Sequence, residues 1–205
     1  MTQPSNSPTR IRTKQRLMDA MIKVVGTDGM ENASVRAIAR EAGCNEAVLY
    51  HHFENKNAMQ EEVFVSLVLE LAETRRESAA RETDPIQFIH SWVAASYRFY
   101  DERPNAFAFV LLTFPPVIPT ENAALNANSE LCASCLRNIT PPEGYTVNLT
   151  EASFSAFRGL LLGPPSDIHL GRIPGPASNY VDEIADLGAK VLLRPIRIEG
   201  HPRPR

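Results

Sequence analysis

Cys132 and Cys135 are the side chains of this sequence best placed for covalent chemistry. On a helix their spacing brings both thiols to one face, where they could form a redox couple or bind a metal. No second pair of this kind and no histidine-rich segment completes a zinc site, and no alternation of strands and helices indicates a thioredoxin-like redox centre. We expect two small helical residues here and no metal. A thiol-based redox sensor or small enzyme using both cysteines stays open as an alternative function.

Positive charge gathers in the N-terminal part of the chain. Residues 1–60 contain eight basic and six acidic residues, a balance of +2, whereas residues 61–205 contain thirteen and eighteen, a balance of −5, so that the whole chain carries −3. Before the first acid the chain has four cations, Arg10, Arg12, Lys14 and Arg16. A basic N-terminal segment of this kind is one typical feature of proteins that bind the phosphates of nucleic acids.

Length and composition exclude several classes of protein. The chain has 205 residues, of which 43% are hydrophobic and 22% charged, as in globular proteins of one or two domains. Its longest run without a charge or a helix breaker, Ala106–Phe114, is too short to cross a membrane. Three cysteines do not make a disulfide framework, so we expect a cytoplasmic protein. The sequence contains no phosphate-binding loop, nucleophile elbow or zinc-protease motif, so we expect neither enzyme activity nor a cofactor.

Three helices are predicted for the N-terminal region. The first covers residues 10–26, with apolar side chains at helical spacing. The second begins after the N-cap Ser34 and ends at Gly43, which suits a left-handed conformation. The third covers Glu46–Phe53 with Asn45 as its N-cap. Two short helices joined by so tight a turn form a helix-turn-helix.

The third predicted helix has one face suited to a DNA groove. At about 100° per residue, Leu49 and Phe53 point to the core, whereas Glu46, Ala47, Tyr50 and His51 form the opposite arc. Such an arc can reach base edges in the major groove while its flanks contact phosphates. The phosphates would be bound by Tyr50 with Lys56 on one side of the groove and by Ser34 with Arg36 on the other.

The remainder of the chain is predicted to be all-α, without a convincing strand. The expected helices are Lys56–Ala80, Pro85–Glu102, Pro104–Thr113, Glu121–Asn138, Thr150–Leu162 and Ser178–Leu193. Glycines and prolines from Gly163 to Pro176 predict a loop before the last of them.

Aromatic and polar side chains of this C-terminal region predict a hydrophobic pocket with a few polar points. The candidate ligand-binding residues are His90, Trp92, Ser96, Tyr97, Phe99, Phe107, Phe154, Phe157 and Arg158, and Phe109 and Phe114 are expected nearby. The last two predicted helices carry apolar stripes interrupted by small residues, at which two copies of the chain could pair.

The segment SVRAIAREAGCNEAVLYHHFENKNAM, residues 34–59, resembles the DNA-binding motif of the TetR family of bacterial transcription regulators. The resemblance implies an all-α homodimer that binds a palindromic double-stranded DNA operator and, in most members, releases it when a small-molecule effector binds. The implied parts are a helix-turn-helix domain (10–55) and a ligand-binding and dimerisation domain (56–195). Prolines and small polar residues at the two ends of the chain indicate a disordered arm (1–9) and an irregular tail (196–205).

Transferred by position, the family pattern puts Tyr50, His51 and Lys56 on phosphates and Ser34, Arg36, Glu46 and Ala47 along the groove. Two residues depart from the pattern. Cys44 replaces a usual valine, and Glu46 brings an acid close to phosphates unless it accepts a hydrogen bond from cytosine. The expected function is repression relieved by a small hydrophobic ligand. An activator without a small-molecule inducer is the alternative within the family.

Overall fold

The computed structural model describes residues 8–112 and 123–196, with side chains described for residues 8–110 and 130–196. Phe114, most of the predicted arm (1–9) and most of the predicted tail (196–205) therefore lie outside the described residues. The chain divides into two compact units. The N-terminal unit comprises residues 1–71 and 102–125, and the C-terminal unit comprises residues 72–101 and 126–205.

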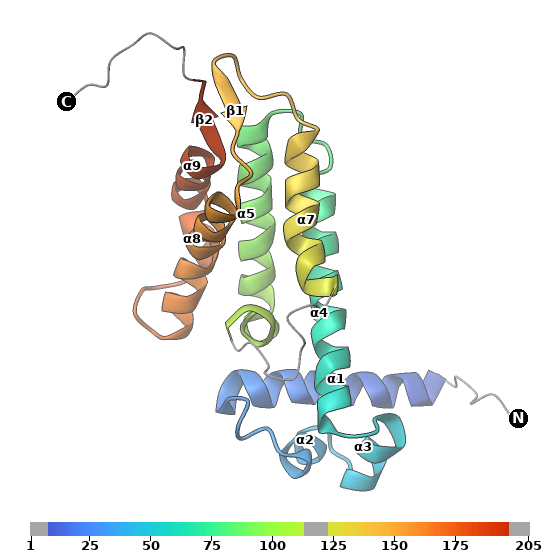
Figure 1. Ribbon diagram of the computed structural model, residues 1–205. Helices are drawn as coiled ribbons and strands as arrows, with labels where there is room; N and C mark the ends of the chain where they lie inside the picture. Colours follow the sequence, from blue (N-terminus) through green and yellow to red (C-terminus); the bar gives the residue numbers. More distant parts are fainter. Residues whose placement is uncertain (1–7, 113–122, 197–205) are drawn as a thin grey trace, which may run out of the picture. The chain divides into compact units, whose positions relative to one another are not determined.

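The N-terminal unit is built on α1, the helix drawn in blue in Figure 1. Helix α1 buries one stripe that includes Leu17, Met21 and Val25. Against it pack the two short helices of the helix-turn-helix and α6. The elements of this unit are α1 (Pro8–Asp28), α2 (Val35–Glu41), α3 (Glu46–His52), the first part of α4 (Lys56–Ala79), α6 (Pro104–Phe107) and the π-helical turn η1 (Ala108–Leu112).

The C-terminal unit centres on α5, which buries residues on most of its sides, among them Phe88, Trp92, Tyr97 and Tyr100. Helices α8 and α9 pack against each other, and Figure 1 shows α5 between this pair and α7. Besides the second part of α4, the elements are α5 (Pro85–Glu102), α7 (Ala123–Arg137), β1 (Tyr145–Val147), α8 (Glu151–His169), the 3-10 helix η2 (Ala177–Tyr180), α9 (Val181–Leu192) and β2 (Leu193–Pro195).

One carboxylate connects the end of α5 to the start of η2. Asp101 accepts hydrogen bonds from the backbone N–H groups of Ala177 and Ser178, with donor–acceptor distances of 2.7 and 3.0 Å. These N–H groups belong to a helix start, where no helical carbonyl is available to them and where negative charge is favoured. Asp101 therefore fixes the start of the α9 segment against α5.

The predicted all-α class is confirmed, with two local corrections. The expectation of no strands is wrong, because β1 and β2 pair antiparallel with Tyr145 opposite Pro195 and Val147 opposite Leu193. Strands of three residues are too short to show a period of two, and these two are formed by segments far apart in the sequence.

The predicted loop from Gly163 to Pro176 is wrong for its first half, because α8 continues to His169 through Pro164 and Pro165. The two prolines remove backbone donors, but their φ angle is compatible with a helix. Pro165 is buried, so packing of this face holds the helix together.

Among the helices of the described residues, none combines the length and the apolar character that spanning a membrane requires.

Candidate nucleic-acid and effector sites

The turn between α2 and α3 has the local structure that the sequence predicts. The Ser34 hydroxyl accepts a hydrogen bond from the backbone N–H of Ala37 at 3.1 Å, and the side-chain oxygen of Asn45 accepts one from Val48 N–H at 3.1 Å. Gly43 has a φ of +64°, in the left-handed region that side chains disfavour. Both predicted N-caps and the predicted glycine turn are confirmed.

Replacing Asn45 by alanine is expected to destabilise the chain by ~1 kcal/mol, because the N–H of Val48 loses its acceptor at the start of α3. Urea unfolding followed by circular dichroism measures this loss. Asn45→Asp is the matched control, since its carboxylate can still accept the bond and is favoured by the helix dipole. An equal loss in both variants would contradict the capping role.

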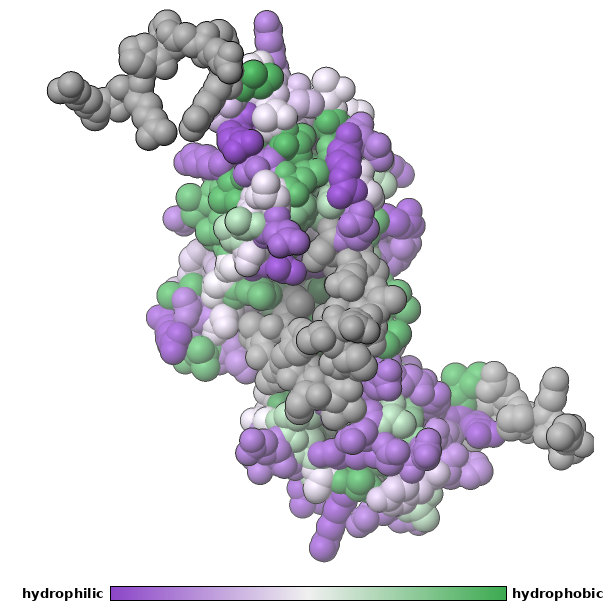
Figure 2. All heavy atoms as spheres, in the orientation of Figure 1, coloured by the Kyte–Doolittle hydropathy of each residue, from purple (hydrophilic) through white to green (hydrophobic). Residues whose placement is uncertain are grey.

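Helix α3 presents the predicted arc to solvent. Leu49 and Phe53 are buried, whereas Glu46, Ala47, Tyr50 and His51 are all exposed. Ser34 and Arg36 are exposed at the start of the neighbouring α2. Lys56 is half-buried at the first residue of α4, whose N-terminus is capped by Asn55 through Ala58 N–H at 2.8 Å. In Figure 2 the visible surface around α1, α2 and α3, at the bottom of the view, is mostly hydrophilic.

The basic residues before Asp19 lie on α1, which begins at Pro8, two residues before the predicted start of this helix. Lys14 and Arg16 have structural partners. Arg16 donates a hydrogen bond to the carbonyl oxygen of Ala42 at the end of α2. Lys14 forms an ion pair with Glu62 of α4 at 2.5 Å and lies 5.3 Å from the centre of the Phe53 ring. These contacts hold the helix-turn-helix against α1 and α4. Because Lys14 and Arg16 are engaged within the fold, the number of cations in the sequence overestimates the positive charge that is available to bind DNA phosphates.

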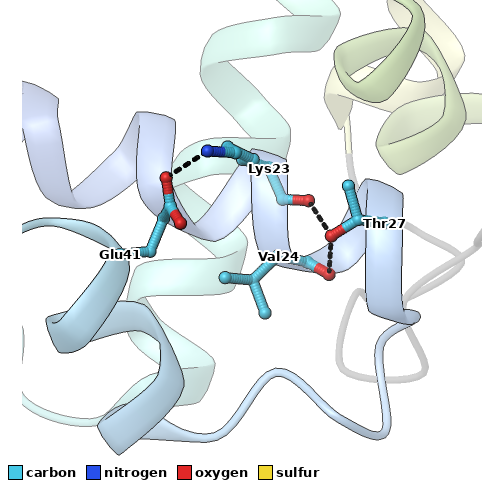
Figure 3. A network of polar contacts seen from close by, with 4 residues as sticks. All are labelled: Lys23, Val24, Thr27 and Glu41. Atoms are coloured by element: carbon cyan, nitrogen blue, oxygen red, sulfur yellow. Dashed lines mark hydrogen bonds and ion pairs between the residues drawn. The ribbon is translucent and has the colours of Figure 1, made fainter.

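A further contact fixes α2 against α1. Lys23 forms an ion pair with Glu41 at 2.6 Å, and one turn later the Thr27 hydroxyl donates to the carbonyl of Lys23 at 3.0 Å (Figure 3). The Lys23 side chain is 60% exposed, so this ion pair adds little stability. Its effect is to orient the last turn of α2.

His52, at the C-terminal end of α3, has a lowered pKa, because it is partly desolvated and because His51, Arg10 and Lys14 add positive charge nearby. With Arg10, Lys14 and Glu62 it lines an open pocket of about 360 Å³, to which Ile11 and Met18 also contribute. The lowered pKa means that His52 stays neutral at a pH where an ordinary histidine begins to charge. It therefore contributes less positive charge to this end of α3 than its residue type indicates.

Cys44 in the turn is half-buried, and its backbone N–H donates to the Ala39 carbonyl at 2.9 Å. The surroundings of Cys132, one of the two cysteines of the predicted pair, disfavour the reactive form of its thiol. Cys132 is buried, and desolvation raises the pKa of its thiol to about 12 in spite of the positive charge of Arg75. Since the thiolate is the reactive form, this environment argues against the alternative of a redox sensor or enzyme.

The residues predicted to bind an effector are found in different surroundings. On α5, Trp92, Ser96, Tyr97 and Phe99 are buried, as is Phe157 on α8, whereas Phe154 is half-buried. Arg158 is exposed, and the partly exposed His90 contacts Asp182 of α9 at 2.9 Å. Phe107 is buried, but it belongs to the N-terminal unit.

Sequence reasoning missed Arg75, which α4 buries in the C-terminal unit with only 5% of its surface exposed. Its Nε donates to the Ser96 hydroxyl at 2.8 Å, and its guanidinium lies 5.3 Å from the centre of a Trp92 ring. The signal was present in the sequence, because Phe64, Val68, Leu71 and Arg75 follow one another at steps of four, three and four. Arg75 thus occupies the next position of the apolar stripe of α4. Because an apolar stripe faces the core, this position predicts a buried arginine and not a solvated one.

Comparison with known proteins identifies the N-terminal region. Residues 17–63 match the model of the bacterial regulatory proteins of the tetR family. Over 97 residues the chain is 31% identical to the HTH-type transcriptional regulator BetI of Serratia proteamaculans, and over 110 residues it is 30% identical to the HTH-type transcriptional repressor KstR2 of Rhodococcus jostii. These alignments cover 46% and 53% of the chain and 48% and 54% of the relatives, so the chain spans about half the length of these two relatives.

Solved structures resemble nearly the whole fold. A TetR family transcription regulator from Marinobacter aquaeolei has a TM-score of 0.71 at 18% identity, with 91% of this chain and 99% of that chain covered. The regulator FadR from Bacillus subtilis, solved in complex with stearoyl-CoA, has a TM-score of 0.66 at 13% identity, with 87% and 98% covered. At these identities the likeness establishes a shared fold.

Proposed function

Because this chain belongs to the TetR family of bacterial regulatory proteins, we propose that it is a sequence-specific DNA-binding repressor that a small hydrophobic ligand releases from its operator. One observation carries the proposal. The helix-turn-helix, capped by Ser34 and Asn45, presents the short polar arc of α3 to solvent while Leu49 and Phe53 anchor the helix in the core.

In this proposal α3 enters the major groove and its side chains read base edges. Glu46 and Ala47 lie along the groove, with Glu46 placed to accept a hydrogen bond from a cytosine amino group. Tyr50, His51 and Lys56 contact phosphates on one side of the groove, and Ser34 and Arg36 do so on the other. Phosphate contacts fix the register of the protein, and base contacts supply the specificity.

The chain acts as a homodimer that recognises an inverted repeat, because a two-fold axis relates two recognition helices to two half-sites. A shallow groove of about 510 Å³ along α8 and α9 supports this pairing. Its lining includes the apolar or small residues Ala156, Gly159, Leu160, Ile184 and Val191. Small residues allow close approach of helices from a second copy.

The effector acts by shifting the population of dimers toward a state whose recognition helices no longer fit successive major grooves. A ligand that binds this state more tightly lowers operator affinity by the same coupling factor. The similarity to the repressor KstR2 supports repression, and the stearoyl-CoA bound to FadR supports an apolar effector. The whole process takes place in the cytoplasm and needs neither a cofactor nor enzyme activity.

Selection of genomic fragments by the purified chain at near-physiological salt tests the proposal. Enrichment of an inverted repeat in reducing buffer is expected, and it would also indicate the regulated genes. If enrichment occurs only without reductant, the thiol-dependent alternative replaces the proposal. If no sequence is enriched in either buffer, sequence-specific repression by the chain alone is wrong.

Lys56→Ala is expected to weaken binding to operator and random DNA alike, by about tenfold or less, because a phosphate contact reads no sequence. It should also lower the salt dependence of the affinity by about one unit of slope for each phosphate that is no longer neutralised. Fluorescence anisotropy at several salt concentrations measures both. The control Arg81→Ala removes the same charge from an exposed position in the C-terminal unit. An unchanged slope in Lys56→Ala would exclude the phosphate role.

A further inference from the structure

The turn between α2 and α3 closes with backbone hydrogen bonds of its own. The Gly43 N–H donates to the Arg40 carbonyl at 3.1 Å. The Cys44 N–H donates to the Ala39 carbonyl at 2.9 Å. With Gly43 in the left-handed conformation, these two bonds form a Schellman motif. Neither bond uses the carbonyl of the C-cap residue Ala42, and the last carbonyls of a helix lack intrahelical donors.

Arg16 of α1 donates to this carbonyl. Its guanidinium forms a hydrogen bond with the Ala42 oxygen across 26 positions of the sequence. The same guanidinium lies against the next residue of the turn, since a Cβ added to Gly43 would be 3.4 Å from a terminal nitrogen of Arg16. A hydrogen bond from a charged donor is stronger than one between neutral groups. Arg16 therefore holds the turn at the residue where α2 ends.

Helix α1 holds the residue before Ala42 as well. Lys23 forms the ion pair with Glu41 at 2.6 Å that Figure 3 shows. Both contacts come from the same helix and meet adjacent residues, so the end of α2 is fixed against α1. Asn45, the N-cap of α3, follows Ala42 by three residues. The place at which α3 begins therefore depends on how α1 holds this turn.

Arg16 is exposed, so its charge could instead serve a DNA phosphate. The two roles have different consequences for DNA binding. A phosphate contact adds affinity for every sequence and adds to the salt dependence. A residue that sets the position of α3 acts on base contacts, whose hydrogen bonds require accurate geometry, and leaves the salt dependence unchanged.

We propose that Arg16 is a positioning residue for sequence recognition. Through its hydrogen bond to the Ala42 carbonyl it sets the position of α3 in the major groove, without contacting DNA itself. Loss of this bond lets the turn shift and weakens the contacts of α3 with base edges more than the contacts with phosphates. The assignment rests on the proposed function, since it names a residue on which operator specificity depends.

Arg16→Met tests the assignment, because it removes the donor and keeps an unbranched side chain. We expect the ratio of operator affinity to random-DNA affinity to fall by about tenfold, with an unchanged salt slope for random DNA. Fluorescence anisotropy with both duplexes at several salt concentrations measures ratio and slope. The matched control is Arg12→Met, which removes the same charge from an exposed residue one turn earlier on α1 and should keep the wild-type ratio.

Hydrogen exchange measured by NMR tests the turn without DNA. In Arg16→Met the N–H groups of Gly43 and Cys44 should exchange at least about fivefold faster, while Met21 in the middle of α1 keeps its wild-type rate. Thermal unfolding checks the fold. If Arg16→Met does not fold, Arg16→Lys takes its place. Lysine keeps the charge but replaces the guanidinium fork by one ammonium on a shorter stem, so the ratio should fall by about threefold.

A lower salt slope with an unchanged affinity ratio would overturn the assignment and make Arg16 a phosphate-binding residue. Equal falls of the ratio in Arg16→Met and Arg12→Met would also overturn it, as would wild-type exchange at Gly43 and Cys44 or, where Arg16→Lys is the variant used, a wild-type ratio. Failure of the proposed function is a separate result. It is seen when the wild-type chain enriches no inverted repeat, whereas the exchange measurement needs no operator.

Discussion

Replacing Ala47 by glutamate is expected to lower operator affinity by about 100-fold or more while leaving the stability of the chain unchanged. Ala47 is exposed on the outward arc of α3, so the longer side chain meets no core residue. In the proposed complex, however, it occupies the groove. There the added carboxylate both fills space next to the bases and repels phosphates, in each of two half-sites. A single mismatch in a site already costs ~1–3 kcal/mol.

Fluorescence anisotropy with the selected operator measures this loss, and thermal unfolding checks the fold. Ala80→Glu is the matched control, because it makes the same change at an exposed position just after α4, in the C-terminal unit. It should keep wild-type affinity within a few-fold. Equal losses of operator affinity in the two variants would show that the net charge of the chain is the cause. Wild-type affinity in Ala47→Glu would contradict the placement of α3 in the major groove.

The sequence predicted the helix-turn-helix almost residue by residue because its signals are local. Ser34, Gly43 and Asn45 act on backbone groups within three or four residues of themselves, and each does in the structure what its residue type favours. The orientation of α3 follows in the same way from helical periodicity, since Leu49 and Phe53 are buried.

Features that depend on contacts between distant parts of the chain could not be predicted from the sequence. The pairing of β1 with β2 joins residues almost fifty positions apart, and their three-residue length leaves no pattern to recognise. Helix α8 continues through Pro164 and Pro165 because burial of that face outweighs the lost backbone hydrogen bonds. Local propensity describes neither effect.

The roles of charged residues likewise depend on contacts that the sequence alone does not show. The cations of α1 look like one basic cluster in the sequence, but Lys14 and Arg16 are used within the fold by Glu62 and by the Ala42 carbonyl. Arg75 was passed over as one of two adjacent arginines on a long helix. Only its burial against Ser96 and Trp92 distinguishes it from the exposed Arg76. Composition counts charges, whereas function depends on where each charge is placed.

Replacing Gly188 by alanine is expected to destabilise the C-terminal unit by ~1–3 kcal/mol, although alanine is normally the better helix residue. A Cβ at Gly188 on α9 would lie 2.7 Å from the ring of Phe157 on α8 and 3.2 Å from Ile89 on α5. The ring of Phe157 is rigid and cannot move away without disturbing its neighbours. The free-energy cost of overpacking therefore outweighs the gain of ~0.5–1 kcal/mol in helix propensity.

Denaturant unfolding of the single and double variants provides the control. Phe157→Leu alone should be destabilising because it removes buried ring atoms. Combined with Gly188→Ala it should lose less than the sum of the two single variants, since the smaller side chain leaves room for the new methyl group. Strict additivity would show that the methyl group is accommodated elsewhere, and a stabilised Gly188→Ala would mean that α9 can move away from α8 and α5 at little cost.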